Sequence, residues 1–167
     1  MPVIFENITE NLRFMIHETE NQLKASFRLF KASNPSDFEK IFLKDDYVDN
    51  LKNLIENECF SHITTDKMLG KRDLNDIRAL QTIAVNLERI ADQGVNITRQ
   101  LGYLGKPDFI DQFEYAPLFN TILEGLEQIM PVYLKHDLQG ALDICKREPL
   151  IDQLYKKNFD RIMEMLS

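Results

Sequence analysis

The chain has few cysteines and no long apolar run. Its two cysteines, Cys59 and Cys145, lack the CxxC spacing of a zinc ribbon and the density of a disulfide framework. We expect both to be buried free thiols in a reducing cytoplasm. No stretch approaches the roughly 18 consecutive apolar residues of a membrane span, and the N-terminus lacks the basic start and apolar core of a signal peptide. We therefore expect a cytoplasmic protein without a membrane span.

Positive charge is also scarce. Lys and Arg number 20 against 27 Asp and Glu, which gives a formal net charge of -7. A nucleic-acid surface needs clustered Lys and Arg to neutralise phosphates, so this balance argues against one and favours metal cations or basic protein surfaces as partners. Neither a Gly-rich phosphate loop nor a nucleophile elbow occurs, and His17, His62 and His136 have no partner motif. We expect no enzyme.

Helical periodicity fills most of the 167 residues. Apolar positions recur at spacings of three and four, without the alternation of strands, which predicts an all-α fold. The expected helices cover residues 4–32, 37–63, a third stretch through Ile77 to Leu101, then 115–136 and 138–165.

The second half of the sequence repeats the first at an offset of 103 residues. Asp45 then aligns with Glu148, and Asp49 with Asp152. The offset predicts a three-helix repeat over 1–103 and a partial, two-helix repeat over 104–167, in which the counterpart of the third helix is absent. We expect either an oligomer that covers the missing surface or a product shorter than the complete fold.

Oxygen-bearing side chains lie four residues apart in two of the predicted helices. Glu88, Asp92 and Asn96 form one stripe, and Asp45 with Asp49 forms another. Residues at this spacing are neighbours on a helix, and like charges there repel by a few tenths of a kcal/mol unless a cation or a basic partner lies between them. The arrangement predicts a metal site or a basic partner.

A helical wheel places the second stripe on an inward face. Asp45 and Asp49 share a narrow sector with Glu56 and with the apolar Phe38, Phe42 and Ile63. Buried, unpaired carboxylates are too costly to arise without a function. Ligation by oxygen alone suits Mg, Mn or Fe, with Zn as an alternative.

Interpretations without a metal remain open from the residues alone. Glu88 and Asp92 also fit a solvated helix edge paired with Arg89 or Arg99, and Asp49 also fits a buried ion pair with Lys52.

Two motifs resemble the PhoU phosphate-uptake regulators. The first is Asp76-Ile77-Arg78 followed by Asn86-Leu87-Glu88-Arg89-Ile90-Ala91-Asp92 and Val95-Asn96-Ile97, and the second is Asp45-x-x-x-Asp49 ahead of Leu51. The resemblance covers residues 5–103 and two helices beyond. The chain departs from the family pattern at Ala91, Gln93 and Gly94, and at Pro149, which stands between Glu148 and Asp152.

The resemblance implies tandem three-helix bundles whose acidic motifs hold iron or zinc clusters in some members, with Mg or Mn as alternatives here. It marks Asp45, Asp49, Glu88 and Asp92 as ligands, and the stripe on the third helix adds Asn96 as a weaker one. Glu148 and Asp152 are the second repeat's pair, and they also fit surface acids at a helix start.

The family's function implies a cytoplasmic, homo-oligomeric regulator. Its partners would be the ATPase subunit of a phosphate ABC transporter and a sensor histidine kinase, through which it reaches the inner membrane. The alternatives are a metal-dependent, hydrolase-type enzyme and a metal-free helical interaction module.

Overall fold

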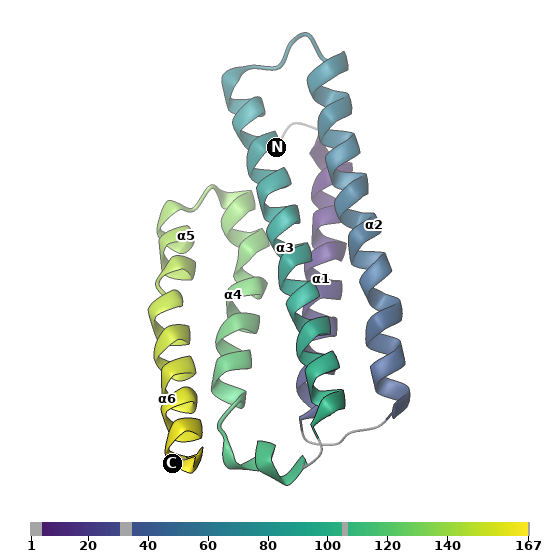
Figure 1. Cartoon of the computed structure of the whole chain (residues 1–167). Coiled ribbons are helices and arrows are strands. Elements are labelled where there is room, and N and C mark those ends of the chain that lie inside the picture. Colours follow the sequence, from purple (N-terminus) through teal and green to yellow (C-terminus); the bar gives the residue numbers. More distant parts are fainter. Residues whose placement is uncertain (1–4, 31–34, 105–106, 167) are drawn as a thin grey trace. The chain divides into compact units, whose positions relative to one another are not determined.

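Long α-helices make up nearly all of the chain. This computed structural model describes residues 5–30, 35–104 and 107–166, without the side chains of 35–37 and 107–109. The helices are α1 (Glu6–Leu29), α2 (Pro35–Thr65), α3 (Lys71–Tyr103), α4 (Ala116–Lys135), α5 (Leu138–Cys145) and α6 (Glu148–Leu166), with the 3-10 helix η2 (Pro107–Gln112) ahead of α4 (Figure 1). Strands are absent from the described ranges, so the all-α prediction is confirmed.

The last predicted helix, 138–165, is wrong as a single element. The chain forms α5, which ends at Cys145, and α6, which begins at Glu148. Pro149 explains the break, because a proline inside a helix has no N–H to donate and its ring clashes with the carbonyl four residues earlier. In the first turn of α6 the missing N–H costs nothing, because those N–H groups have no partner within the helix.

The chain divides into two compact units, each described here by itself. The first comprises Met1–Leu29 and Ser33–Tyr103, and the second Phe30–Ala32 and Leu104–Ser167. The repeat relation between residues 1–103 and 104–167 stays a prediction.

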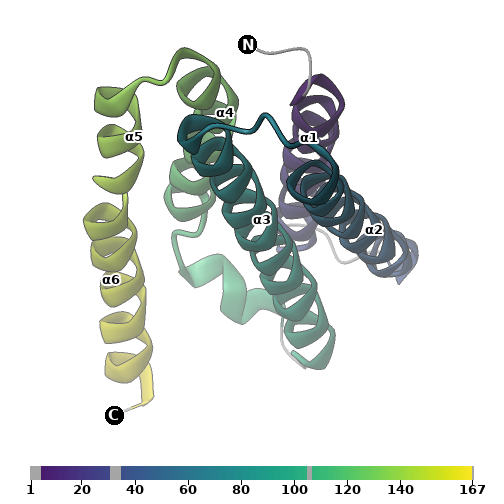
Figure 2. The same ribbon diagram turned by 90° about the horizontal axis from the view of Figure 1, so that it is seen from above.

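The first unit is a bundle in which α1, α2 and α3 each pack against the other two (Figures 1 and 2). Its interior consists mainly of aliphatic side chains at helical spacing, each of which stabilises the fold by about 1.5 to 3 kcal/mol when fully buried. The largest fully buried ones are Ile8, Leu12, Met15, Leu29, Ile41, Ile55, Ile77, Leu80 and Leu87.

Helices α1 and α3 approach closely at Gly94. A Cβ atom there would lie 3.3 Å from Leu23 Cδ2 and 3.5 Å from Ser26 Oγ. The Ser26 hydroxyl donates to the Gly94 carbonyl at 3.0 Å and accepts from the Thr98 hydroxyl at 2.9 Å. The absence of a side chain at Gly94 lets the two helices approach, and the hydrogen bonds of Ser26 and Thr98 hold α1 against α3.

The second unit packs α5 and α6 against α4. Phe119, Leu126 and Met130 of α4 are buried, whereas no residue of α5 or α6 is buried in the part of the chain that the structure describes. Arg147 forms an ion pair with Glu124 at 2.7 Å. Among the described helices, none is both long enough and apolar enough to cross a membrane.

The two cysteines differ in exposure. Cys59 on α2 is buried, as expected, but Cys145 at the end of α5 is exposed. The prediction of two buried thiols is therefore wrong for Cys145, because α5 ends at that residue and has no buried face of its own.

Candidate functional site

Three carboxylates from two helices meet at the surface of the first unit. Asp49 of α2 and Glu88 and Asp92 of α3 each offer one oxygen, and these oxygens lie within 4.8 Å of one another. All three residues are half-buried. Ligand oxygens lie about 2.0 to 2.6 Å from a hard cation, so two ligands of one ion are separated by up to about 4 to 5 Å. The spacing of this carboxylate cluster therefore suits a shared cation.

Helix geometry places the two acids of α3 at the edge of its buried face. That face is made by Ala84, Leu87, Ala91, Gly94 and Val95, among others. Four residues turn an α-helix through one full turn and about 40° more, so each step from Glu88 to Asp92 to Asn96 moves further toward solvent.

Asn96 is consequently not brought to the cluster. Its side chain is exposed, and its Oδ1 accepts a hydrogen bond from Arg99 Nη1 at 3.1 Å. The structure places Asn96 on the solvent-facing side of α3.

The acids of α2 also lie beside a buried face rather than within it. Ile41, Val48, Leu51, Ile55 and Cys59 form that face. The wheel sector that we predicted to point inward also holds Phe42 and Ile63, which are 38% and 45% exposed, so this prediction is wrong. The error arose from centring the inward face on aromatic residues instead of on the aliphatic positions.

Asp45 extends the cluster along α2. Burial raises the pKa of Asp45 above its ordinary value of 3.8, a hydrogen bond from Gln22 opposes the shift, and the charges of Asp92 and Asp49 raise the pKa further. Gln22 Nε2 donates to Asp45 Oδ1 at 3.4 Å. All four predicted carboxylate ligands of the first repeat are therefore in electrostatic contact.

The charge on Glu88 is also disfavoured. Burial raises the pKa of Glu88, the charge of Asp92 raises it further, and Lys52 lowers it. The ammonium group of Lys52 forms its ion pair with Glu56 at 3.7 Å, whereas the sequence suggested Asp49 as its partner. The cluster thus concentrates negative charge that a bound cation would neutralise.

Gln22 is the residue that the motif-based prediction missed. It is fully buried, and it brings α1 to the acids of α2. The signal for it was a polar residue in the seam of α1, between the buried Thr19 and Ser26 at spacings of three and four. That signal identifies a buried amide but not its partner.

The second predicted acidic pair lies on α6. Glu148 and Asp152 are both exposed near the start of that helix. Neither belongs to a group of three potential metal ligands among the described residues. Their position agrees with the alternative of surface acids that favour the helix dipole.

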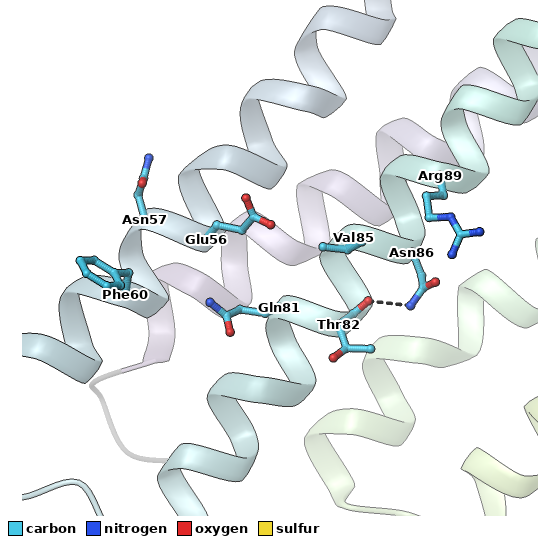
Figure 3. Close-up of a pocket in the computed structure, with 8 residues that line it drawn as sticks. All are labelled: Glu56, Asn57, Phe60, Gln81, Thr82, Val85, Asn86 and Arg89. Atoms are coloured by element: carbon cyan, nitrogen blue, oxygen red, sulfur yellow. Dashed lines mark hydrogen bonds between the residues drawn. The ribbon is translucent and has the colours of Figure 1, made fainter.

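A groove of about 620 Å³ runs between α2 and α3. Figure 3 shows Glu56, Asn57 and Phe60 on α2, with the Glu56 side chain directed toward α3. The lining from α3 consists of Gln81, Thr82, Val85, Asn86 and Arg89. The Asn86 amide is already occupied by the Thr82 carbonyl at 2.8 Å. The groove contains Glu56 but none of the three clustered acids.

The central part of the chain matches a known domain. Residues 12–101, more than half of the sequence, match the PhoU domain. The chain belongs to the PhoU family. The matched region ends within α3 and includes Asp45, Asp49, Glu88 and Asp92.

Several curated PhoU homologues are similar over most of this PhoU-family chain. The phosphate-specific transport system accessory protein PhoU homologue of Clostridium acetobutylicum is 26% identical, over 98% of this chain and 77% of its own length. The homologue from Borreliella burgdorferi is 27% identical, over 77% of this chain and 60% of its own. Homologue 1 of Thermotoga maritima is 23% identical, over 92% and 66%. No solved structure matches significantly.

Proposed function

We propose that this PhoU-family protein is an accessory regulator of phosphate transport that acts through protein contacts and holds a cation in its carboxylate cluster. The family match over residues 12–101 supports the regulatory role, and the names of the relatives place them with phosphate-specific transport systems. The proposed site of action is the cytoplasm, as a homo-oligomer that contacts the transporter's ATPase subunit and a sensor histidine kinase.

The residues present fit a metal. Asp49, Glu88 and Asp92 supply oxygens at ligand spacing, with Asp45 adjacent. Carboxylates are hard ligands, so the cluster suits iron, manganese or magnesium, and zinc also accepts them. We propose an iron or zinc cluster that joins α2 to α3, with magnesium or manganese as alternatives. The bound metal would neutralise the repulsion among the acids and add its binding free energy to the stability of the fold.

The regulatory role is tested in cells. Uptake of labelled phosphate is measured at high and low external phosphate, with and without the gene, and after complementation. We expect loss of the gene to change how uptake responds to external phosphate, and complementation to restore the response. Uptake that responds identically in all three strains contradicts the regulatory role.

The metal site is tested by elemental analysis of the purified protein. Asp92→Ala removes one of the three clustered ligands, so we expect the amount of bound metal to fall. At saturating metal we expect the melting temperature to fall with it, by several degrees. Asp160→Ala, which removes an exposed acid of α6, serves as the matched control. An Asp92→Ala variant with the same metal stoichiometry as the parent rejects the site.

The groove between α2 and α3 does not favour the hydrolase-type alternative. A metal-activated water needs substrate space at the metal. The lining residues of this groove do not include Asp49, Glu88 or Asp92. The enzyme alternative would be supported if the protein hydrolysed model phosphate esters in a metal-dependent reaction and if Asp92→Ala abolished that reaction.

A further inference from the structure

Gln22 is a buried amide whose oxygen is unsatisfied. The residue is fully buried in the seam of α1, and Oε1 has no hydrogen-bond partner among the described residues. Native structures satisfy most buried polar atoms, and a glutamine in a helical seam can be replaced by leucine at nearly the same volume. The presence of an amide at this buried position therefore points to a function for its polar atoms.

The other buried polar side chains of α1 are satisfied. Thr9 and Thr19 donate to the carbonyls of Phe5 and Met15, four residues earlier, at 2.7 and 2.9 Å. Ser26 is held by Gly94 and Thr98 of α3. The unsatisfied oxygen is thus specific to Gln22, the one residue of this set whose side chain contacts an acid beside the carboxylate cluster.

The amide of Gln22 has two orientations that differ in what they present to Asp45. In the structure Nε2 faces Asp45 Oδ1 at 3.4 Å, at the long end of hydrogen-bond distances. A half-turn of the amide about its last torsion exchanges nitrogen and oxygen with little change in shape. Without a cation two facing oxygens repel each other, whereas with a cation between them both become ligands.

We infer that Gln22 and Asp45 together supply ligand oxygens to the cation bound at the neighbouring carboxylate cluster, with Gln22 as the neutral ligand, so that α1 closes the site together with α2 and α3. This inference rests on the proposed metal site. Amide oxygens are ordinary ligands of hard cations, and a neutral ligand adds coordination without adding to the repulsion among the acids. Cation binding would then reorient the amide and satisfy the buried oxygen.

The test is titration of metal-free protein with Mn²⁺ and with Zn²⁺, each alone, against three variants. Gln22→Leu removes the oxygen and the N–H group, and we expect it to lower affinity about tenfold or more. Gln22→Glu keeps an oxygen but loses the N–H group, and we expect it to bind at least as tightly as the parent. Thr19→Val, which changes a buried polar residue satisfied within its own helix, is the control and should leave affinity unchanged.

The variants separate a ligand from a residue that only positions Asp45. A Gln22→Glu variant that loses as much affinity as Gln22→Leu shows that an oxygen at this position does not bind the ion, and that result overturns the inference. A parent and a Gln22→Leu variant of equal affinity also overturn it while leaving the metal site intact. A parent that binds neither ion at millimolar concentration rejects the metal site and the inference together.

A spectroscopic measurement gives an independent check on folded protein. The side-chain amide resonances of Gln22, assigned by their loss in Gln22→Leu, should shift when Zn²⁺ binds. Circular dichroism establishes that each variant is folded before the titration. Amide resonances that stay unchanged at saturating Zn²⁺ contradict direct ligation.

Discussion

At the scale of single residues, the first unit separates two kinds of buried polar group. The hydroxyls of Thr9 and Thr19 bond to carbonyls of their own helix. They cost little, because each donor is satisfied locally. Gln22 and Asp45, by contrast, depend on each other across two helices. The hydroxyls show how the bundle buries polar groups at little cost. The Gln22–Asp45 pair lies beside the proposed cation site.

The two thiols should differ sharply in reactivity. Burial raises the pKa of Cys59 from its ordinary value of 9.0 to about 11, whereas Cys145 is exposed. The thiolate is the reactive form. At pH 8 we expect a disulfide reagent to modify the exposed Cys145 rapidly and the buried Cys59 only upon unfolding.

Cys145→Ser is the control for this measurement and should abolish the rapid phase. The raised pKa of Cys59 also makes the free energy of unfolding depend on pH. The unfolded state loses the thiol proton near pH 9.0 and the folded state near 11, so Cys59 favours folding below 9 and loses that contribution as the pH rises through 11. Two thiols of equal reactivity in the folded protein contradict the assignment.

At the scale of elements, close packing of α1 against α3 depends on one glycine. We expect Gly94→Leu to destabilise the protein by about 1 to 3 kcal/mol, because the added side chain must displace Leu23 and Ser26. Urea denaturation, with the midpoint and slope fitted together, measures the change.

Gly102→Leu is the matched control in the same helix. Gly102 is exposed, and a Cβ atom there would meet only the Phe38 ring, at 3.5 Å. We expect its effect to stay within about 0.5 kcal/mol. Equal losses at the two glycines would contradict a specific role for the contact between α1 and α3, because helix propensity alone favours leucine over glycine at both positions.

Periodicity predicted the elements better than it predicted their faces. The aliphatic seam residues Ile41, Val48 and Ile55 are buried as a period of 3.6 requires, and the starts and ends of α1 and α4 fall within a few residues of expectation. The inward sector of α2 was wrong because several of its apolar residues, such as Phe42, remain exposed. The break between α5 and α6 was a consequence of Pro149 that helical spacing alone does not register.

The candidate site was predictable only in part. Spacing identified Asp49, Glu88 and Asp92, which share the edge of two helical faces. Spacing alone did not exclude Asn96. Each step of four residues rotates the side chain by about 40° around the helix axis, and the direction of that rotation relative to solvent is known only when the buried face is known. Gln22 required the tertiary contact between α1 and α2, which no pattern within one helix contains.

At the scale of the whole molecule, the two units differ in how much they bury. The first has a continuous aliphatic core, whereas α5 and α6 contribute no buried residue among those described. We expect a fragment of residues 1–104 to unfold cooperatively and to keep the metal-dependent rise in melting temperature. A fragment of residues 104–167 should show much weaker helical circular dichroism.

Comparison with the intact chain completes this experiment. Calorimetry of the 1–104 fragment with and without Zn²⁺ measures the metal-dependent shift directly. A fragment that is unfolded at 25 °C, or that no longer responds to metal while the intact chain does, shows that the first unit depends on the rest of the chain.

The charged flank of α2 also determines how that helix can open. Asp45, Asp49, Lys52 and Glu56 lie beside its aliphatic seam, so one side of its contact with the bundle is ionic. The proposed cation, shared with α3, would have to be released before α2 could separate. Hydrogen exchange of the α2 amides should therefore slow in proportion to the ratio of free metal to its dissociation constant. Amide protection along α2 would then report metal occupancy in the intact protein.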